Sequence, residues 1–273
     1  MCGAEIDWNI SRIESNFRNY IEKGAWGHWP SVKKEIKYVD RPVWLVSFDK
    51  ISSIIILLTE INGKVFVIMT TRSEKVSTHK GQVCFPGGQK EPTDSSPIQT
   101  ALREAEEEIG LPQTSVRILG LISIIPSFLH HVTIVVGVIT NPNFVPVLSS
   151  TEVDNYFYCP LEFFISTDNL QTNIMDLENC DLTLFNFQYF CPVTERTHKI
   201  WGLTSVVAVF ASCIAYNKLH PISFNWSPCN EVDANYKRAI ISYLIGFDKD
   251  NNRIIFYIYS DYRTVCKKMA SRL

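Results

Sequence analysis

The chain has 273 residues, of which 46% are hydrophobic and 20% are charged, and its formal net charge is −2. This composition is typical of a soluble globular protein with a large core and argues against a disordered chain. The near-neutral charge excludes a globally basic surface, so we expect no nucleic-acid partner. The longest apolar runs fall well short of the roughly 20 residues that cross a bilayer, so we also expect no membrane span.

The first predicted element is a β-hairpin. Residues 54–58 and 65–69 are rich in β-branched and other apolar residues, and Asn62-Gly63 lies between them. An Asn-Gly pair between two such runs is typical of a tight hairpin turn. Further along, Pro86-Gly87-Gly88 predicts a turn with unusual backbone freedom. Cys84, just before this turn, is expected to be a small buried hydrophobe rather than a nucleophile.

An acidic helix is predicted over residues 98–109. Ser95 or Ser96 can cap its start, Pro97 suits its first turn, and Gly110 marks its end. At about 100° per residue, its apolar residues share one arc, which predicts a face that docks onto the rest of the protein. These residues are Ile98, Ala101, Leu102, Ala105 and Ile109.

Three glutamates share a second face of this helix. Glu104 and Glu108 are spaced i,i+4 and Glu104 and Glu107 i,i+3, so their like charges repel one another. A divalent cation would turn this repulsion into attraction, since Mg²⁺ takes carboxylate oxygens from proteins. The alternative is an ordinary solvated acidic face. Glu106 lies outside the arc and is expected to be merely solvated.

The later elements are mostly strands. Residues 116–125 and 132–139 are predicted to be β-strands and residues 204–216 a buried helix. Residues 248–252 form a predicted turn between β-rich segments at 239–247 and 253–259. We therefore predict an α/β fold, an α/β/α sandwich with a mixed sheet and one acidic helix.

The acidic helix and the turn before it resemble the Nudix box, in which a glycine and an acidic residue precede R-E-x-x-E-E-x-G-hydrophobic. Two positions depart from the general pattern: an aspartate replaces a glutamate, and the spacer before the arginine is one residue longer. The core of the motif is intact. The matching residues are Gly88, Asp94, Arg103, Glu104, Glu107, Glu108, Gly110 and Leu111.

Both departures are shared by the coenzyme A diphosphatase branch of the Nudix family. The chain also resembles that branch's upstream pattern L-L-T-x-R-S-x-x-x-R-x-x-x-G-x-x-x-F-P-G-G, except that Ser77 stands at its second arginine. Lys75, His79 and Lys80 are nearby cations that could substitute, or they form a solvated basic loop. The matching residues are Thr70, Arg72, Ser73, Gly81, Phe85, Pro86, Gly87 and Gly88.

Downstream segments continue the resemblance. Thr151-Glu152-Val153 is similar to the branch's E-V segment, and Trp201-Gly202-Leu203-Thr204 is similar to its W-G-x-T segment. We expect Trp201 to lie in the core rather than to form a platform for adenine.

The resemblance implies a metal-dependent diphosphatase that uses Mg²⁺ or Mn²⁺. Glu104, Glu107, Glu108 and the Gly88 backbone would hold the metal, and Arg103 would orient the glutamates by bidentate pairing. The general base is either Glu104 or Glu152, although Glu152 is equally expected to be an ordinary surface residue. The implied substrate-binding residues are Arg72, Ser73, Lys80, Phe85 and Gly87.

The implied small-molecule substrate is coenzyme A (CoA) or acyl-CoA. It would be cleaved to adenosine 3′,5′-bisphosphate and 4′-phosphopantetheine or its acylated form. The alternatives are a Nudix hydrolase of NADH or ADP-ribose, and a non-catalytic nucleotide sensor of the same fold. A sensor often loses a glutamate of the box, and all three are present here.

The domain organisation is predicted as an N-terminal extension (1–45), a Nudix domain (46–220) and a C-terminal extension (221–273). The extension ends in Ser271-Arg272-Leu273, which resembles the S-K-L address read by the peroxisomal import receptor. We therefore expect a peroxisomal protein, or otherwise a cytoplasmic one.

Overall fold

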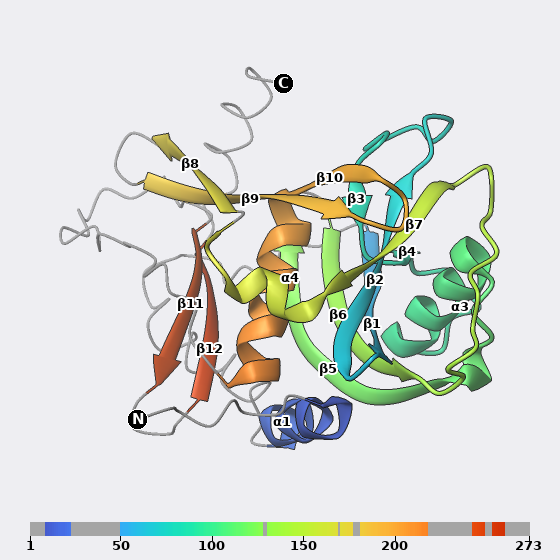
Figure 1. Cartoon of the computed structure of the whole chain (residues 1–273), viewed down its shortest axis with the longest axis horizontal. Helices are drawn as coiled ribbons and strands as arrows, with labels where there is room; N and C mark the ends of the chain where they lie inside the picture. Colours follow the sequence, from blue (N-terminus) through green and yellow to red (C-terminus); the bar gives the residue numbers. More distant parts are fainter. Residues whose placement is uncertain are drawn as a thin grey trace.

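The structure, a computed structural model, describes residues 9–22, 50–127, 130–168, 170–176, 181–217, 242–248 and 253–259. Its centre is a seven-stranded mixed sheet (Figure 1) in the order β3-β2-β1-β6-β5, with β4 paired to β1 and β7 paired to β2. Only β1 and β6 run parallel among these pairs. The strands are β1 (Lys50–Ile61), β2 (Lys64–Arg72), β3 (Val83–Cys84), β4 (Gly87–Gln89), β5 (Val116–Ser127), β6 (His130–Ile139) and β7 (Val153–Pro160).

The predicted first hairpin is confirmed. Strands β1 and β2 pair antiparallel up to Ile61 and Lys64, which leaves Asn62 and Gly63 as the two turn residues. Both have positive φ, 51° and 75°. Two left-handed residues in a row match the right-handed twist of the flanking strands, which is why Asn-Gly is favoured there.

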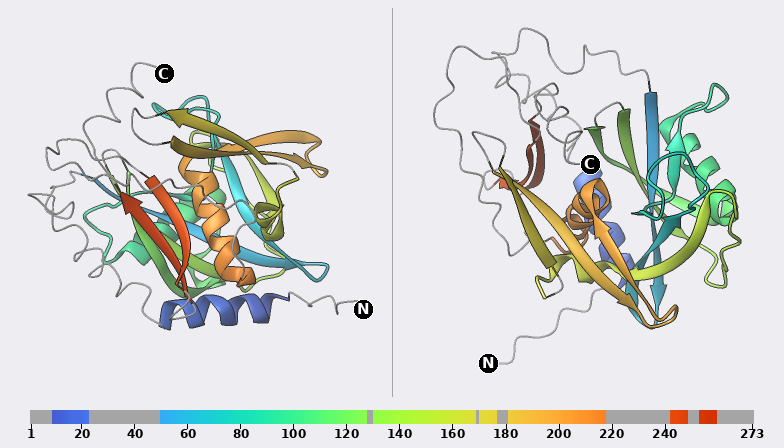
Figure 2. Two further views of the ribbon diagram at one scale, coloured as in Figure 1. Left: turned by 90° about the vertical axis from the view of Figure 1, so that its left-hand side faces the viewer. Right: turned by 90° about the horizontal axis from the view of Figure 1, so that it is seen from above.

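Helices cover both faces of the sheet (Figure 2). Helix α3 (Pro97–Ile109) packs on one face, where alternate strand residues such as Ile55, Leu57 and Ile68 are buried against Ala101 and Ala105. Helix α4 (Gly202–Tyr216) packs on the other face, and its residues 205–216 are all buried. A helix with apolar residues on all of its faces is buried by the elements around it. The predicted α/β/α arrangement with a mixed sheet is therefore observed.

A second, three-stranded sheet covers the α4 side and was not predicted from the sequence. It consists of β8 (Leu170–Asp176), β9 (Asp181–Cys191) and β10 (Arg196–Trp201), in the order β10-β9-β8. In the chain, the short helix η4 (Leu161–Ile165) connects β7 to β8, and the short helix η3 (Gln113–Ser115) precedes β5. The predicted C-terminal strands also form, as the antiparallel pair β11 (Ser242–Asp248) and β12 (Arg253–Tyr259).

Helix α1 (Ile10–Glu22) lies within the segment predicted as an N-terminal extension, and it packs into the main core. Ile13 and Phe17 are fully buried, and Arg117 of β5 donates both of its Nη groups to Glu14. Gly120 of β5 has φ of 143°, and a Cβ there would lie 3.0 Å from Ile21 Cδ1, so this glycine lets the helix approach the sheet. Helix α1 thus shares the core of the predicted Nudix domain.

We expect Phe17→Ala to lower the free energy of unfolding by about 3–5 kcal/mol, the usual cost of removing a buried phenylalanine. Urea denaturation followed by circular dichroism measures this. Asn19→Ala, on the exposed side of the same helix, is the matched control and should change stability by no more than about 0.5 kcal/mol. Equal stability of the two variants would contradict the packing of α1 into the core.

Candidate active site

Helix α3 begins and ends as its sequence predicts. Ser96 is the N-cap, and its Oγ accepts a hydrogen bond from the backbone N–H of Gln99 at 3.2 Å. Gly110 ends the helix in the left-handed conformation, with φ of 67°. These caps fix which residues face the sheet. As predicted, Ala101, Ala105 and Ile109 are buried against it.

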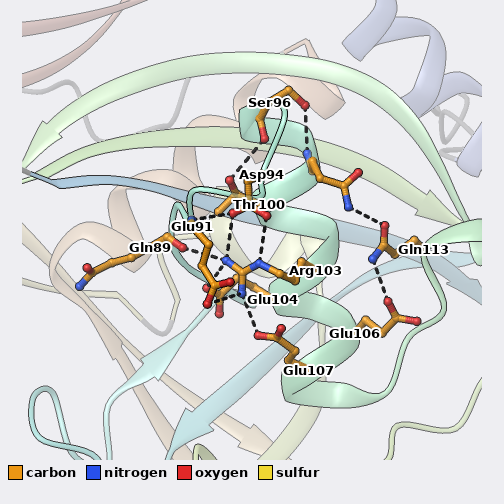
Figure 3. A network of polar contacts seen from close by, with 11 residues as sticks. Gln89, Glu91, Asp94, Ser96, Thr100, Arg103, Glu104, Glu106, Glu107 and Gln113 are labelled. Atoms are coloured by element: carbon orange, nitrogen blue, oxygen red, sulfur yellow. Dashed lines mark hydrogen bonds and ion pairs between the residues drawn. The ribbon is translucent and has the colours of Figure 1, made fainter.

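The centre of the site is an ion-pair network around Arg103 (Figure 3). The guanidinium donates to both carboxylate oxygens of Asp94, from Nε at 3.0 Å and from Nη2 at 3.1 Å. It also donates to Glu104 at 3.0 Å, to Glu107 at 2.8 Å and to the backbone carbonyl of Gln89 at 2.8 Å. Arg103 therefore contacts two of the predicted metal ligands, but its bidentate partner is Asp94.

Asp94 is the functional residue that sequence reasoning left without a role. Its side chain is only 2% exposed, and the hydrogen bonds from Arg103 lower its pKa to about 2. It also accepts the backbone N–H of Glu91 at 2.8 Å, which closes the loop before α3. The sequence feature that could have indicated this role is the position of Asp94 in the Nudix box, nine residues before Arg103.

Gly87 and Gly88, predicted as part of a turn, instead begin strand β4, which pairs with β1 and lies against the acidic helix. A Cβ at Gly87, whose φ is 152°, would overlap the backbone of Ser53 and Ile54. A Cβ at Gly88 would overlap the carboxylate of Glu104. The absence of a side chain at Gly87 therefore lets β4 lie close to β1, and its absence at Gly88 makes room for the Glu104 carboxylate beside the main chain of β4.

Glu108 is buried, with 3% of its surface exposed, although it belongs to the acidic face. Burial raises its pKa to about 8, and the charge of Glu104 adds to the shift. Burial likewise raises the pKa of Glu104. The charge of Glu152 acts on both groups, so the loop before β7 brings a fourth carboxylate near these two.

The donor set suits a hard divalent cation, because carboxylate and carbonyl oxygens are the ligands that Mg²⁺ prefers. Within the described ranges, however, no three His, Cys, Asp or Glu side chains are gathered as a ready metal cluster. Glu104 and Glu107 are turned to Arg103, and Glu108 accepts the Gly87 N–H at 3.4 Å. Metal binding would therefore require these carboxylates to exchange partners.

Comparison with known proteins gives the family. A sequence model of the NUDIX domain matches residues 49–174. The peroxisomal coenzyme A diphosphatase NUDT7 of Mus musculus is 33% identical over 172 residues, which cover 62% of this chain and 71% of the mouse protein. The chain belongs to the Nudix hydrolase family. Arg103 and the glutamates around it thus lie in the Nudix box of a hydrolase that acts on diphosphate bonds.

Other relatives of this Nudix hydrolase agree with that assignment. Mitochondrial Nudix hydrolase 15 of Arabidopsis thaliana is 34% identical over 159 residues, 58% of this chain and 55% of its own length. Nudix hydrolase 3 of Caenorhabditis elegans is 35% identical over 166 residues, 57% of this chain and 69% of its own. This chain therefore spans between about half and about seven-tenths of these relatives.

Similarity to solved structures is weaker. A C. elegans Ap4A hydrolase in a binary complex aligns with 41% of this chain and 81% of its own at 19% identity and a TM-score of 0.35. The family assignment therefore depends on the sequence relatives.

The residues predicted to bind substrate in this Nudix hydrolase fall into two groups. Arg72 ends β2, and its charge acts on Cys84 of β3 and on Glu108 of the acidic helix. Its Nε is buried and has no hydrogen-bond partner among the described atoms. Lys80 is exposed in the loop that follows. A buried donor without a partner is costly to the fold.

The other predicted substrate-binding side chains face inward. Ser73 is fully buried, and its Oγ accepts the Lys75 N–H at 3.3 Å. Phe85 is buried in the core on the α4 side of the sheet. Burial raises the pKa of the Cys84 thiol to about 11, in keeping with its expected inert role. Ser73 and Phe85 therefore support the loop and the sheet, and their side chains present no surface to a substrate.

We expect Asp94→Asn to lower the free energy of unfolding at pH 7 by about 3 kcal/mol, because it leaves the Arg103 charge without its bidentate partner. The depressed pKa of Asp94 stabilises the fold above its ordinary value of 3.8, and this contribution is lost as the pH falls toward about 2. The difference between wild type and variant should therefore shrink from pH 4 to pH 2 in urea denaturation experiments.

Glu91→Gln is the matched control. Glu91 lies 3.9 Å from Arg103 Nη1, but its side chain is 58% exposed, so its loss should cost less than about 1 kcal/mol. If both variants lost the same stability, or if the Asp94→Asn difference did not change with pH, the anchoring role of Asp94 would be disproved.

Proposed function

We propose that this Nudix hydrolase cleaves the diphosphate bond of CoA or acyl-CoA. The observation that carries the proposal is the similarity to the mouse peroxisomal coenzyme A diphosphatase over 71% of its length. The CoA-branch pattern of residues 68–88 supports it, because these residues include the end of β2, all of β3 and the start of β4 beside the acidic helix. Water adds to one phosphorus, the bridging P–O bond breaks, and adenosine 3′,5′-bisphosphate and 4′-phosphopantetheine leave.

We propose that Glu104, Glu107, Glu108 and the Gly88 backbone hold Mg²⁺ or Mn²⁺, as divalent metals are generally used in this family. A bound metal of this kind neutralises diphosphate charge and lowers the pKa of a bound water. Arg103, fixed by Asp94, keeps Glu104 and Glu107 on one side of the helix. Glu104 and Glu152 are the two candidates for the general base, and burial raises the pKa of Glu104, which is the direction that makes a carboxylate a stronger base.

Arg72 is proposed to contact a substrate phosphate. Its unpartnered Nε and the effect of its charge on Glu108 support this proposal. Arginine suits this role because its planar fork pairs two phosphate oxygens at once. Lys80, exposed in the loop, would add a second cation where Ser77 replaces the arginine of the CoA-branch pattern.

We expect Glu107→Gln to lower kcat/KM for CoA by about 100-fold or more, the scale of losing a contact that stabilises developing charge. Release of adenosine 3′,5′-bisphosphate in the presence of Mg²⁺, followed by chromatography, measures it. NADH and ADP-ribose are assayed alongside. Hydrolysis of NADH alone by the wild type would exclude the CoA proposal, and no hydrolysis of any of the three would favour a sensor.

Glu106→Gln is the matched control, because Glu106 lies on the same helix but is exposed and hydrogen-bonds Gln113 instead of Arg103. Its activity should stay within about twofold of wild type. A full rate from Glu107→Gln, or an equal loss from both variants, would contradict the proposed metal ligands.

We propose a Nudix domain over 46–220 followed by a C-terminal extension, and the predicted N-terminal extension is revised because it contains helix α1. Helix α1 belongs to the core of the Nudix domain, whereas residues 271–273 lie outside the described part of the chain. None of the described helices is long and apolar enough to cross a membrane. We propose a peroxisomal location, with the import receptor as partner, from the C-terminal Ser-Arg-Leu and the name of the mouse relative.

Deletion of Ser271 to Leu273 should therefore move a fluorescent N-terminal fusion from peroxisomes to the cytosol. Fluorescence microscopy against a peroxisomal marker measures this, and the full-length fusion with Arg272→Lys should still be imported. Continued import of the truncated fusion would show that the tripeptide is not the address.

A further inference from the structure

One polar side chain beside the acidic helix has no partner. Ser53, on strand β1, is fully buried, and its Oγ has no hydrogen-bond partner among the described atoms. A buried hydroxyl without a partner is costly to the fold. Buried polar groups of this kind are rare, and they are found where a group serves the chemistry of a site or meets water or an ion.

The Ser53 side chain lies on the face of the sheet that α3 covers. Side chains alternate between the two faces along a strand, and Ile55 and Leu57, two and four residues further along, are buried against α3. The neighbouring strand β6 agrees, because Thr133 lies opposite Ser53 and Val135, two residues later, is buried in the same cluster. The pairing of β1 with β6 is regular over this stretch, so no register shift interrupts the alternation. The Ser53 hydroxyl is therefore on the α3 side.

Strand β4 places the Glu104 carboxylate next to Ser53. Gly88 of β4 lies directly opposite Ser53 in the antiparallel ladder, so the two positions point to the same side. A Cβ at Gly88 would overlap both carboxylate oxygens of Glu104, so the carboxylate occupies the place where a side chain opposite Ser53 would begin. Opposite Cβ atoms in such a ladder are about 5 Å apart. The hydroxyl and the carboxylate are therefore neighbours, and no side chain of β4 stands between them.

Glu104 needs a new hydrogen-bond donor if it turns from Arg103 to a cation. It accepts a hydrogen bond from Arg103 Nη2 at 3.0 Å, and metal binding would require it to exchange this partner. Carboxylates that hold metals in proteins are themselves hydrogen-bonded, which fixes their direction. The Ser53 hydroxyl can turn among its staggered positions, and its donor is unused. It can therefore replace Arg103 as the donor to Glu104.

We propose that Ser53 is a positioning residue, which donates its hydroxyl to Glu104 when this carboxylate holds a divalent cation. The inference rests on the proposed function, because it takes Glu104 as a metal ligand, but it does not depend on which diphosphate is the substrate. The hydroxyl is costly to the fold alone and gains its partner with the cation. Removing it should therefore stabilise the protein and weaken metal binding, two changes in opposite directions.

Titration of the full chain with Mn²⁺ alone, followed by the electron paramagnetic resonance of free Mn²⁺, tests this role without substrate. Ser53→Ala should weaken Mn²⁺ binding by about 10- to 100-fold, the range for removing a group that hydrogen-bonds a metal ligand. In the presence of EDTA the same variant should melt about 2–4 °C above wild type, because it lacks the unpartnered hydroxyl. A merely structural role would lower the melting temperature instead.

Thr133→Val is the matched control, since Thr133 is also buried and lies on the same face, on the other side of Ser53 from Gly88. It removes a hydroxyl that is one strand, about 4.8 Å, further from Glu104. Its Mn²⁺ affinity should stay within about twofold of wild type. An equal loss of affinity in Ser53→Ala and Thr133→Val would overturn the role of Ser53.

A double variant shows whether Ser53 acts through Glu104. In the Glu104→Ala background, Ser53→Ala should change Mn²⁺ affinity by less than about twofold, because the interaction that it removes is already lost. A further loss as large as that in the wild-type background would show that Ser53 acts on another group, and it would contradict the proposal.

The outcomes separate this inference from the proposed function. If wild type hydrolyses CoA and Ser53→Ala binds Mn²⁺ as wild type does, Ser53 has no such role and the proposed function stands. If wild type binds Mn²⁺ but does not hydrolyse CoA, a selective loss of affinity in Ser53→Ala supports the role of Ser53, and the proposed substrate fails. If wild type does not bind Mn²⁺, the inference is wrong together with the proposed metal ligands.

Discussion

The bidentate contact between Arg103 and Asp94 is the interaction on which the rest of the site depends. The negative charges of Glu104, Glu107 and Glu108 repel one another on α3. Arg103, on the same helix, offsets this repulsion by pairing with Glu104 and Glu107. Arginine has enough donors to hold Asp94 with two and still reach Glu104, Glu107 and the Gln89 carbonyl. Lysine, which lacks the planar fork, would not join the loop, the strand β4 and the helix in one network.

The three glutamates of the acidic face lie in different environments. Glu104 is paired with Arg103 beside the main chain at Gly88, and Glu107 is paired with Arg103 while half exposed to water. Glu108 is buried, and burial raises its pKa to about 8. Because folding raises this pKa above its ordinary 4.5, the group costs the folded state stability as the pH rises from 4.5 toward 8.

The parts of the fold that the sequence predicts are those with local causes. The limits of α3 follow from Ser96, Pro97 and Gly110, and the first hairpin follows from two residues that tolerate positive φ. The three-stranded sheet was missed because its pairing joins segments with no tight-turn signal between them. The apolar residues of α1, Ile13 and Phe17 among them, are at helical spacing, so a buried face could have been expected, but its partner at Gly120 is distant in the sequence.

The side chains of the site also divide into those that a local pattern places and those that packing between distant segments places. The spacing of the glutamates follows from helix periodicity, so their common face could be predicted, but the burial of Glu108 depends on how β3 and β4 lie over it. Motif matching placed Ser73 and Phe85 with the substrate residues and Trp201 in the core, and the burial of each is the reverse. A motif records which residues a family keeps, whereas only packing decides which side of the main chain each residue faces. Phe85 comes just before Gly87 and Gly88 in the motif. Its burial in the core fixes the position of strand β4, which carries these two glycines.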